Sequence, residues 1–315
     1  MNTPYPRLSV ISPMFNEEAG IAAFCSQLRE ELDSLGFPYE VIFVDDGSTD
    51  RTIEVVRLAQ WPSAKILVLT RNVGHQRALE AGIAVAQGEL IATMDADGQH
   101  PPSVLTDMIN LTQDPSVDVV YARRTETGKE SFFRTFTAIT YYRLMRVVTG
   151  VPIGDRQADF RLIRRSVLQA INPVQGDKTL RMLLPYLGFR CATIDYVAAP
   201  RISGNSRFGL RRQIHLLLDS VIDFSARPLR FVAMMALLLA SSAIVWLCLV
   251  LVTWWNARAI AGWTSVMTAV LIVGAMSLLA LAIVGSYLAR IYDILKAHPR
   301  SVVSRTIRFN PDPNE

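Results

Sequence analysis

Short apolar runs alternate with segments of helical periodicity over the first part of the chain. Runs rich in β-branched residues predict strands, and the amphipathic segments Glu18–Leu35 and Gly74–Ala86 predict helices between them. The predicted strands are Leu8–Ser12, Glu40–Val44, Lys65–Thr70, Glu89–Met94 and Val117–Ala122. Alternation of this kind predicts an α/β fold, with a mainly parallel, doubly wound sheet covered by helices on both faces.

Two long stretches near the C-terminus contain no charged residue. They are Phe231–Trp255 and Ala259–Ala289, separated only by residues 256–258. Each exceeds the roughly 20 residues that cross a bilayer as a helix, so we expect a transmembrane hairpin. A pair of buried core helices is the alternative, although core helices rarely run this long without a charge. The hairpin also explains why the 315 residues are 50% hydrophobic and only 19% charged.

Arginine and lysine flank the two predicted spans. Before them lie Arg207, Arg211, Arg212, Arg227 and Arg230, and after them Arg290, Lys296, Arg300, Arg305 and Arg308. The turn carries only Arg258, so the positive-inside rule places both termini in the cytoplasm. The first ten residues lack the features of a secretory signal, and none is expected.

These patterns predict four regions along the chain. They are a cytoplasmic α/β domain over 1–207, an interfacial amphipathic helix over 208–230, two transmembrane helices over 231–289 and a cytoplasmic tail over 290–315. Ser131–Val148 also mixes aromatic residues with arginines and predicts an interfacial helix, with docking against the soluble domain as the alternative. Cys25, Cys191 and Cys248 are widely spaced without a CxxC pair, which excludes a disulfide framework and a cysteine zinc site.

Acidic and polar clusters follow three of the predicted strands. They are Pro13–Glu18, Asp45–Asp50 and Asp95–Pro102. In a parallel sheet the ligand lies beyond the carboxyl ends of the strands, so these clusters should share one crevice. Helix capping is an alternative for the first two clusters. It does not explain Asp95 and Asp97, which face the same way in an extended segment and predict an oxygen-ligated Mg²⁺ or Mn²⁺ site.

The ordered set of motifs resembles a known family. PMFNEE, VDDGSTD and MDADGQHPP stand at successive strand ends, and ADFRL, RISGNSRF and the closing SYLARIYDILKAHPR follow. The chain resembles glycosyltransferase family 2, with a Rossmann-like GT-A fold. Within it, the chain is similar to the polyprenyl-phosphate glycosyltransferases related to dolichol-phosphate mannose synthase.

The resemblance implies a membrane enzyme of envelope polysaccharide synthesis. It implies inverting, metal-dependent transfer of one sugar from a nucleotide-diphosphate sugar, expected to be UDP-linked, to undecaprenyl phosphate. The reaction is expected at the cytoplasmic face of a bacterial inner membrane, with the bilayer and both substrates as partners and no nucleic acid. A homo-oligomer, the choice between Mg²⁺ and Mn²⁺ and the identity of the sugar stay open.

Most site residues are assigned through the resemblance. The metal is assigned to Asp95, Asp97 and Gln99, and the nucleotide sugar to Pro13, Asn16, Glu17, Asp45, Asp46, Asp95, Arg201, Ser206 and Arg207. Asp46 is favoured for the base edge, with the reverse order of Asp45 and Asp46 open. Asp97 and Asp159 are the predicted catalytic residues, and Asp159 is a base or orients an acceptor phosphate that is already ionised. An ion pair with Arg161 or Arg164 is the alternative for Asp159.

Arginines after the fifth predicted strand suit the lipid phosphate. They are Arg123, Arg124 and Arg134, with solvated surface charges as the alternative. Two other functions share the acidic motifs. A processive polysaccharide synthase would commonly carry a QxxRW motif, which this sequence lacks, and a membrane-tethered nucleotide-sugar-binding protein would bind without turnover.

Overall fold

A computed structural model describes most of the α/β region and one long C-terminal helix. The described residues are 6–125, 157–171, 187–197, 263–295 and 301–309, with single positions at 184 and between 232 and 252. The chain forms two compact units. The first comprises Met1–Tyr142, Pro152–Arg207 and Pro299–Glu315, and the second Arg143–Val151 and Phe208–His298.

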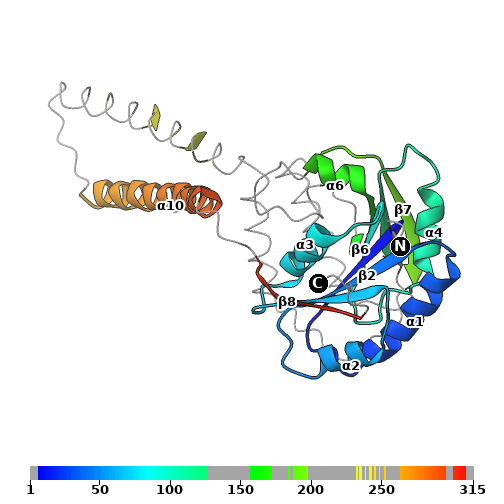
Figure 1. The fold of residues 1–315 in the computed structure, drawn as a ribbon. Coiled ribbons are helices and arrows are strands. Elements are labelled where there is room, and N and C mark those ends of the chain that lie inside the picture. Colours follow the sequence, from blue (N-terminus) through cyan, green and yellow to red (C-terminus); the bar gives the residue numbers. More distant parts are fainter. Residues whose placement is uncertain are drawn as a thin grey trace. The chain divides into compact units, whose positions relative to one another are not determined.

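The first unit is built on one eight-stranded sheet, with strand order β7-β5-β6-β4-β1-β2-β3-β8 (Figure 1). Its elements are β1 Leu8–Met14, α1 Ile21–Ser34, β2 Tyr39–Asp45, α2 Thr52–Leu58, β3 Ala64–Leu69, α3 His75–Val85, β4 Leu90–Thr93, α4 Val104–Leu111, β5 Val119–Thr125, β6 Gln157–Arg164, α6 Arg165–Ile171, β7 Cys191–Val197 and β8 Val303–Arg308. Strands β1 to β4 pair in parallel, as do β5 and β7. Strand β6 runs antiparallel to β4 and β5, and β8 runs antiparallel to β3.

Helices cover both faces of this sheet. On β1, Val10 packs in the same core cluster as Phe24 of α1 and Leu105 of α4. The next residue, Ile11, packs in another cluster with Leu79 of α3. Because both faces are buried, the central strands are apolar at nearly every position. The structure confirms the predicted α/β fold with a mostly parallel sheet.

The five predicted strands correspond to β1–β5, and the two predicted helices to α1 and α3. Three further strands were not predicted. Strand β6 lies between β4 and β5, but it carries Arg161 and Arg164 and therefore lacks the apolar run that predicts a central strand. Strand β8 lies in the predicted C-terminal tail and adds an edge strand beside β3.

The second unit contains α10, Trp263–Leu295, which overlaps the second predicted span. Its window Ile272–Ala289 has a mean hydropathy of 2.1, is not buried by the protein, and is long enough to cross a membrane. It is the single such helix among the described residues. Over 232–252 the single described positions are helical, and the rest of the first predicted span lies outside the described residues. The two predicted interfacial segments, and with them Arg134, Arg201, Ser206 and Arg207, also lie outside.

Candidate active site

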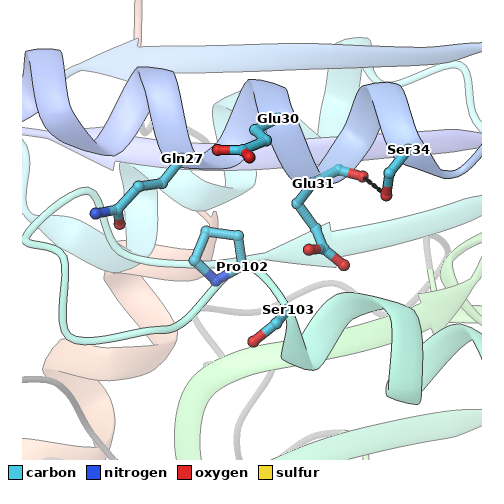
Figure 2. A pocket seen from close by; sticks show the side chains of 6 residues that line it. All are labelled: Gln27, Glu30, Glu31, Ser34, Pro102 and Ser103. Atoms are coloured by element: carbon cyan, nitrogen blue, oxygen red, sulfur yellow. Dashed lines mark hydrogen bonds between the residues drawn. The ribbon is translucent and has the colours of Figure 1, made fainter.

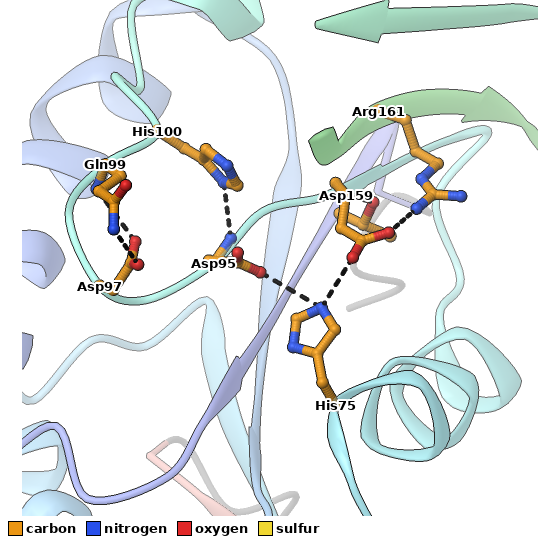
Figure 3. A network of polar contacts seen from close by, with 8 residues as sticks. His75, Asp95, Asp97, Gln99, His100, Asp159 and Arg161 are labelled. Carbon is orange, nitrogen blue, oxygen red and sulfur yellow. Dashed lines mark hydrogen bonds and ion pairs between the residues drawn. The ribbon is translucent and has the colours of Figure 1, made fainter. Parts of the chain in front are cut away.

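The loop that follows β4 carries the predicted metal carboxylates (Figure 3). The buried Oδ1 of Asp95 accepts no hydrogen bond among the described residues, and the His75 imidazole forms only an ion pair with it, with Nε2 at 3.4 Å. Burial raises the pKa of Asp95, and the neighbouring carboxylates of Asp159 and Asp97 act in the same direction, while His100 and His75 oppose them. A buried carboxylate oxygen that accepts no hydrogen bond, beside further carboxylates, fits a divalent cation.

Asp97 is held by the third predicted ligand, Gln99. The Gln99 backbone N–H donates to Asp97 Oδ1 at 3.1 Å, and its side-chain Nε2 donates to Oδ2 at 2.8 Å. The carbonyl Oε1 of Gln99 accepts from Arg124 Nη1 at 3.0 Å. No cluster of three or more His, Cys, Asp or Glu suited to a metal occurs within the part of the chain that the structure describes. Two carboxylates completed by substrate phosphates are the usual arrangement for Mg²⁺.

Asp159 of β6 lies close to the same loop. Its Oδ1 pairs with Nη2 of the buried Arg161, and its Oδ2 lies 3.5 Å from His75 Nε2. The same His75 nitrogen lies 3.4 Å from Asp95 Oδ1. Burial lowers the pKa of His75, but the Asp159 hydrogen bond and the charge of Asp95 outweigh it, so the pKa is raised. The imidazole therefore stands between a carboxylate from the loop after β4 and a carboxylate from β6 (Figure 3).

The ion-pair alternative for Asp159 is present in part. Arg161 makes the pair, whereas Arg164 donates to the backbone carbonyl of Val117 at 2.8 Å. Nε and Nη1 of Arg161 are buried without a hydrogen-bond partner among the described residues. The pair occupies one oxygen of Asp159 and leaves the other directed to His75.

Asp46 anchors the segment that leads into α3. Its Oδ1 accepts from the Val73 N–H at 2.7 Å, and its Oδ2 accepts from the Gly74 N–H at 2.9 Å. Gly74 has a φ of 95°, a conformation that favours glycine, and His75 follows as the first residue of α3. The carboxylate favoured for the base edge thus fixes the chain next to His75, and its role toward the base stays a prediction.

The loops after β1 and β2 are joined by side chains from the predicted nucleotide site. Asn16 Oδ1 accepts from the Thr49 N–H at 2.8 Å, and the Glu17 N–H donates to Thr52 Oγ1 at 2.8 Å. Asp45 is buried at the end of β2 and accepts from the Ser48 N–H. Pro13 is also buried, near the end of β1. The structure therefore brings Pro13, Asn16, Glu17, Asp45 and Asp46 to one edge of the sheet.

Comparison with known proteins identifies the chain. The profile of Glycosyl transferase family 2 matches residues 9–171. The chain belongs to this family. The protein is therefore a glycosyltransferase.

Relatives in this family match almost the whole glycosyltransferase. The uncharacterised glycosyltransferase YkcC of Bacillus subtilis (strain 168) is 33% identical over 302 residues, which are 95% of this chain and 93% of the relative. The SfII prophage-derived bactoprenol glucosyl transferase of Shigella flexneri is 28% identical over 311 residues, 97% of this chain and 100% of the relative.

A solved structure supports the fold. Glucosyl-3-phosphoglycerate synthase from Mycobacterium tuberculosis, in complex with Mn²⁺, UDP and phosphoglyceric acid, superposes with a TM-score of 0.51. It is 17% identical, and the match covers 70% of this chain and 77% of that one. The glycosyltransferase thus has the GT-A-like α/β fold that the motifs indicate.

Two of the predicted lipid-phosphate arginines of the glycosyltransferase have protein partners. Arg123 donates to both carboxylate oxygens of Asp195 on β7, at 2.6 and 2.8 Å. Arg124 contacts Gln99 and so lies beside the loop after β4 that carries the predicted metal carboxylates, called the metal loop below. Their predicted role toward the lipid stays a prediction, and the structure places Arg124 next to Gln99, a predicted metal ligand.

The contacts that two histidines make with the carboxylate-bearing segments were not predicted. His100 is buried, stacks on Phe160 at 5.0 Å and meets Tyr196 edge-on at 5.9 Å. Its Nδ1 accepts the backbone N–H of Asp95 at 3.0 Å, so the ring fixes the metal loop. His75 and His100 lie in the segments that follow β3 and β4, as the acidic clusters follow β1, β2 and β4, but the sequence does not show which carboxylates they contact.

A separate hollow of about 380 Å³ lies between α1 and the start of α4 (Figure 2). It is lined by Gln27, Glu30, Glu31, Ser34, Pro102 and Ser103. None of the predicted site residues lines it, so the strand-end cluster, and not this hollow, is the candidate active site.

Proposed function

We propose that this glycosyltransferase transfers a single sugar from a UDP-linked donor to a polyprenyl phosphate such as undecaprenyl phosphate. The observation that carries the proposal is the meeting of Asp95, from the metal loop, with Asp159, from β6, on either side of His75. One carboxylate suits the donor diphosphate through a metal, and the other suits the acceptor. Both lie at the sheet edge where α/β folds bind ligands.

On the donor side, Asp95 and Asp97 would hold Mg²⁺ or Mn²⁺. When bound, such an ion neutralises the charge that develops on the departing nucleoside diphosphate. The residues around the pair keep it in place, because His100 holds the Asp95 backbone and Gln99 holds the Asp97 carboxylate.

On the acceptor side, Asp159 orients the lipid phosphate or removes a residual proton. An oxygen of the acceptor phosphate forms a bond to C1 of the sugar as the bond from C1 to the donor diphosphate breaks. One displacement of this kind inverts the configuration at C1. The nucleoside diphosphate leaves with the electron pair of the broken bond.

The order of strands supports a membrane hairpin. Strand β8 follows α10 in sequence yet pairs with β3 in the sheet that also contains β7. Chain segments of one sheet lie on one side of a membrane, so the chain between Val197 and Val303 crosses an even number of times. If α10 crosses, the charge-free segment 231–255 supplies the second crossing. The flanking arginines support a position of the sheet on the cytoplasmic side of a bacterial inner membrane.

The acceptor is proposed from the relatives. Proteins named bactoprenol glucosyl transferase match nearly the full chain, spans included. Glucose is therefore the first sugar to test in a donor panel.

A transfer assay tests the proposal. Membranes containing the protein are incubated with polyprenyl phosphate, Mn²⁺ and each of a panel of labelled UDP-sugars. A labelled product that extracts into chloroform is expected with the wild type and is absent with Asp97→Ala. No product from any donor, with folded protein that binds UDP, would contradict the proposal and favour a binding protein without turnover.

A further inference from the structure

His75 occupies the space between the donor and acceptor carboxylates. Its Nε2 lies 3.4 Å from Asp95 Oδ1 and 3.5 Å from Asp159 Oδ2 (Figure 3). The two carboxylates come from elements far apart in sequence, the loop after β4 and strand β6. One side chain from a third element, α3, thus reaches both.

Asp159 is held by contacts to its backbone and to both of its carboxylate oxygens. The backbone carbonyl of Asp159 accepts from Thr93 Oγ1 at 2.6 Å, which ties β6 to β4. Oδ1 is held by Arg161, whose side chain is only 1% exposed. These contacts fix the backbone and one oxygen. Oδ2 lies 3.5 Å from His75 Nε2, so the imidazole helps to orient this second oxygen.

His75 is itself firmly placed. It begins α3 directly after Gly74, whose N–H is bound by the buried carboxylate of Asp46. The Val73 N–H is bound by the other oxygen of Asp46. Gly47 lets this segment approach closely, since a Cβ there would lie 2.8 Å from the Asn72 nitrogen. The nucleotide-side loop after β2 therefore determines where the imidazole stands.

We infer that His75 is a positioning residue that holds Asp159 in register with the metal carboxylate Asp95, and so sets the acceptor phosphate in line with C1 of the donor sugar. The inference rests on the proposed function. It assigns His75 an effect on turnover that acts through Asp159, and not on donor binding. Partners of this kind, once removed, cost about 10- to 100-fold in activity.

The test compares His75→Ala and His75→Gln with wild type and with Gln27→Ala, an exposed control on α1. Turnover is measured with the UDP-sugar and polyprenyl phosphate that the wild type uses, and the Kd of UDP in Mn²⁺ is measured by calorimetry. We expect His75→Ala to lower kcat about 10- to 100-fold with an unchanged Kd for UDP. His75→Gln, which restores an N–H donor of similar reach, should recover part of kcat.

Two results would overturn the role of His75. One is wild-type kcat in His75→Ala. The other is parallel loss of kcat and of UDP binding in both variants, which would place His75 in the donor site or the folding core. An inactive wild type that binds UDP would instead contradict the proposed function itself, so the two failures are distinguishable.

Discussion

Replacing Asp46 by asparagine tests whether this residue binds the nucleotide base, as the sequence predicts, or holds the backbone segment that leads into α3. In the structure both carboxylate oxygens accept backbone N–H groups, from Val73 at 2.7 Å and from Gly74 at 2.9 Å. The side chain is 4% exposed, so water cannot replace a lost acceptor. An asparagine offers one acceptor and turns an amide N–H toward the other donor.

The cost follows from these two bonds. Loss of one hydrogen bond to a charged group, with a buried donor left unpaired, costs about 2 kcal/mol. For a domain of this size that corresponds to a fall in Tm of about 4–8 °C. Because the segment leads into His75, kcat should also fall.

Thermal unfolding of purified Asp46→Asn, with and without UDP, measures the loss of stability and any change in UDP binding, and the transfer assay measures kcat. Asp107→Asn, an exposed substitution on α4, is the control and should change stability by no more than about 0.5 kcal/mol. A wild-type Tm for Asp46→Asn, together with weakened UDP binding, would refute the structural role and restore the base-edge prediction.

Three further predictions concern other residues of the sheet domain. His100→Phe keeps the ring stack but removes the acceptor for the Asp95 N–H, so calorimetry should show weaker binding of UDP in Mn²⁺. Unchanged binding would count against a role of His100 in holding the loop after β4. Arg124→Ala should lower kcat/KM for the donor more than Arg123→Ala does, and the reverse order would favour a lipid-phosphate role for Arg123. Burial raises the pKa of Cys25 to about 12, so its thiolate is scarce at pH 8, and mass spectrometry should find it alkylated by iodoacetamide only after unfolding.

The central strands and the position of the Asp95–Pro102 loop at a strand end were predictable because their signals are local. Strands β1–β5 are short apolar runs, and Asp95 and Asp97 stand two residues apart directly after one of them. Such signals depend on neighbours in sequence. They do not depend on which strands pair.

The remaining features depend on long-range pairing. Strand β6 reads as polar because it carries Arg161 and Arg164. Arg161 is buried where β6 pairs with β4 and β5, and no local pattern reveals that pairing. Strand β8 is defined only by its pairing with β3, a strand far from it in sequence. The bridging position of His75 likewise arises from three separate elements, and a sequence that shows only its place at a helix start cannot predict it.

The central claim is the addition of one sugar to a polyprenyl phosphate, and mass spectrometry of the lipid product tests it most directly. Purified full-length protein is incubated with undecaprenyl phosphate, Mn²⁺ and the UDP-sugar that it consumes. We predict a lipid whose mass exceeds that of the acceptor by a single glycosyl residue, with one UDP released per lipid. A ladder of longer products, or UDP release without a glycosylated lipid, would contradict the account.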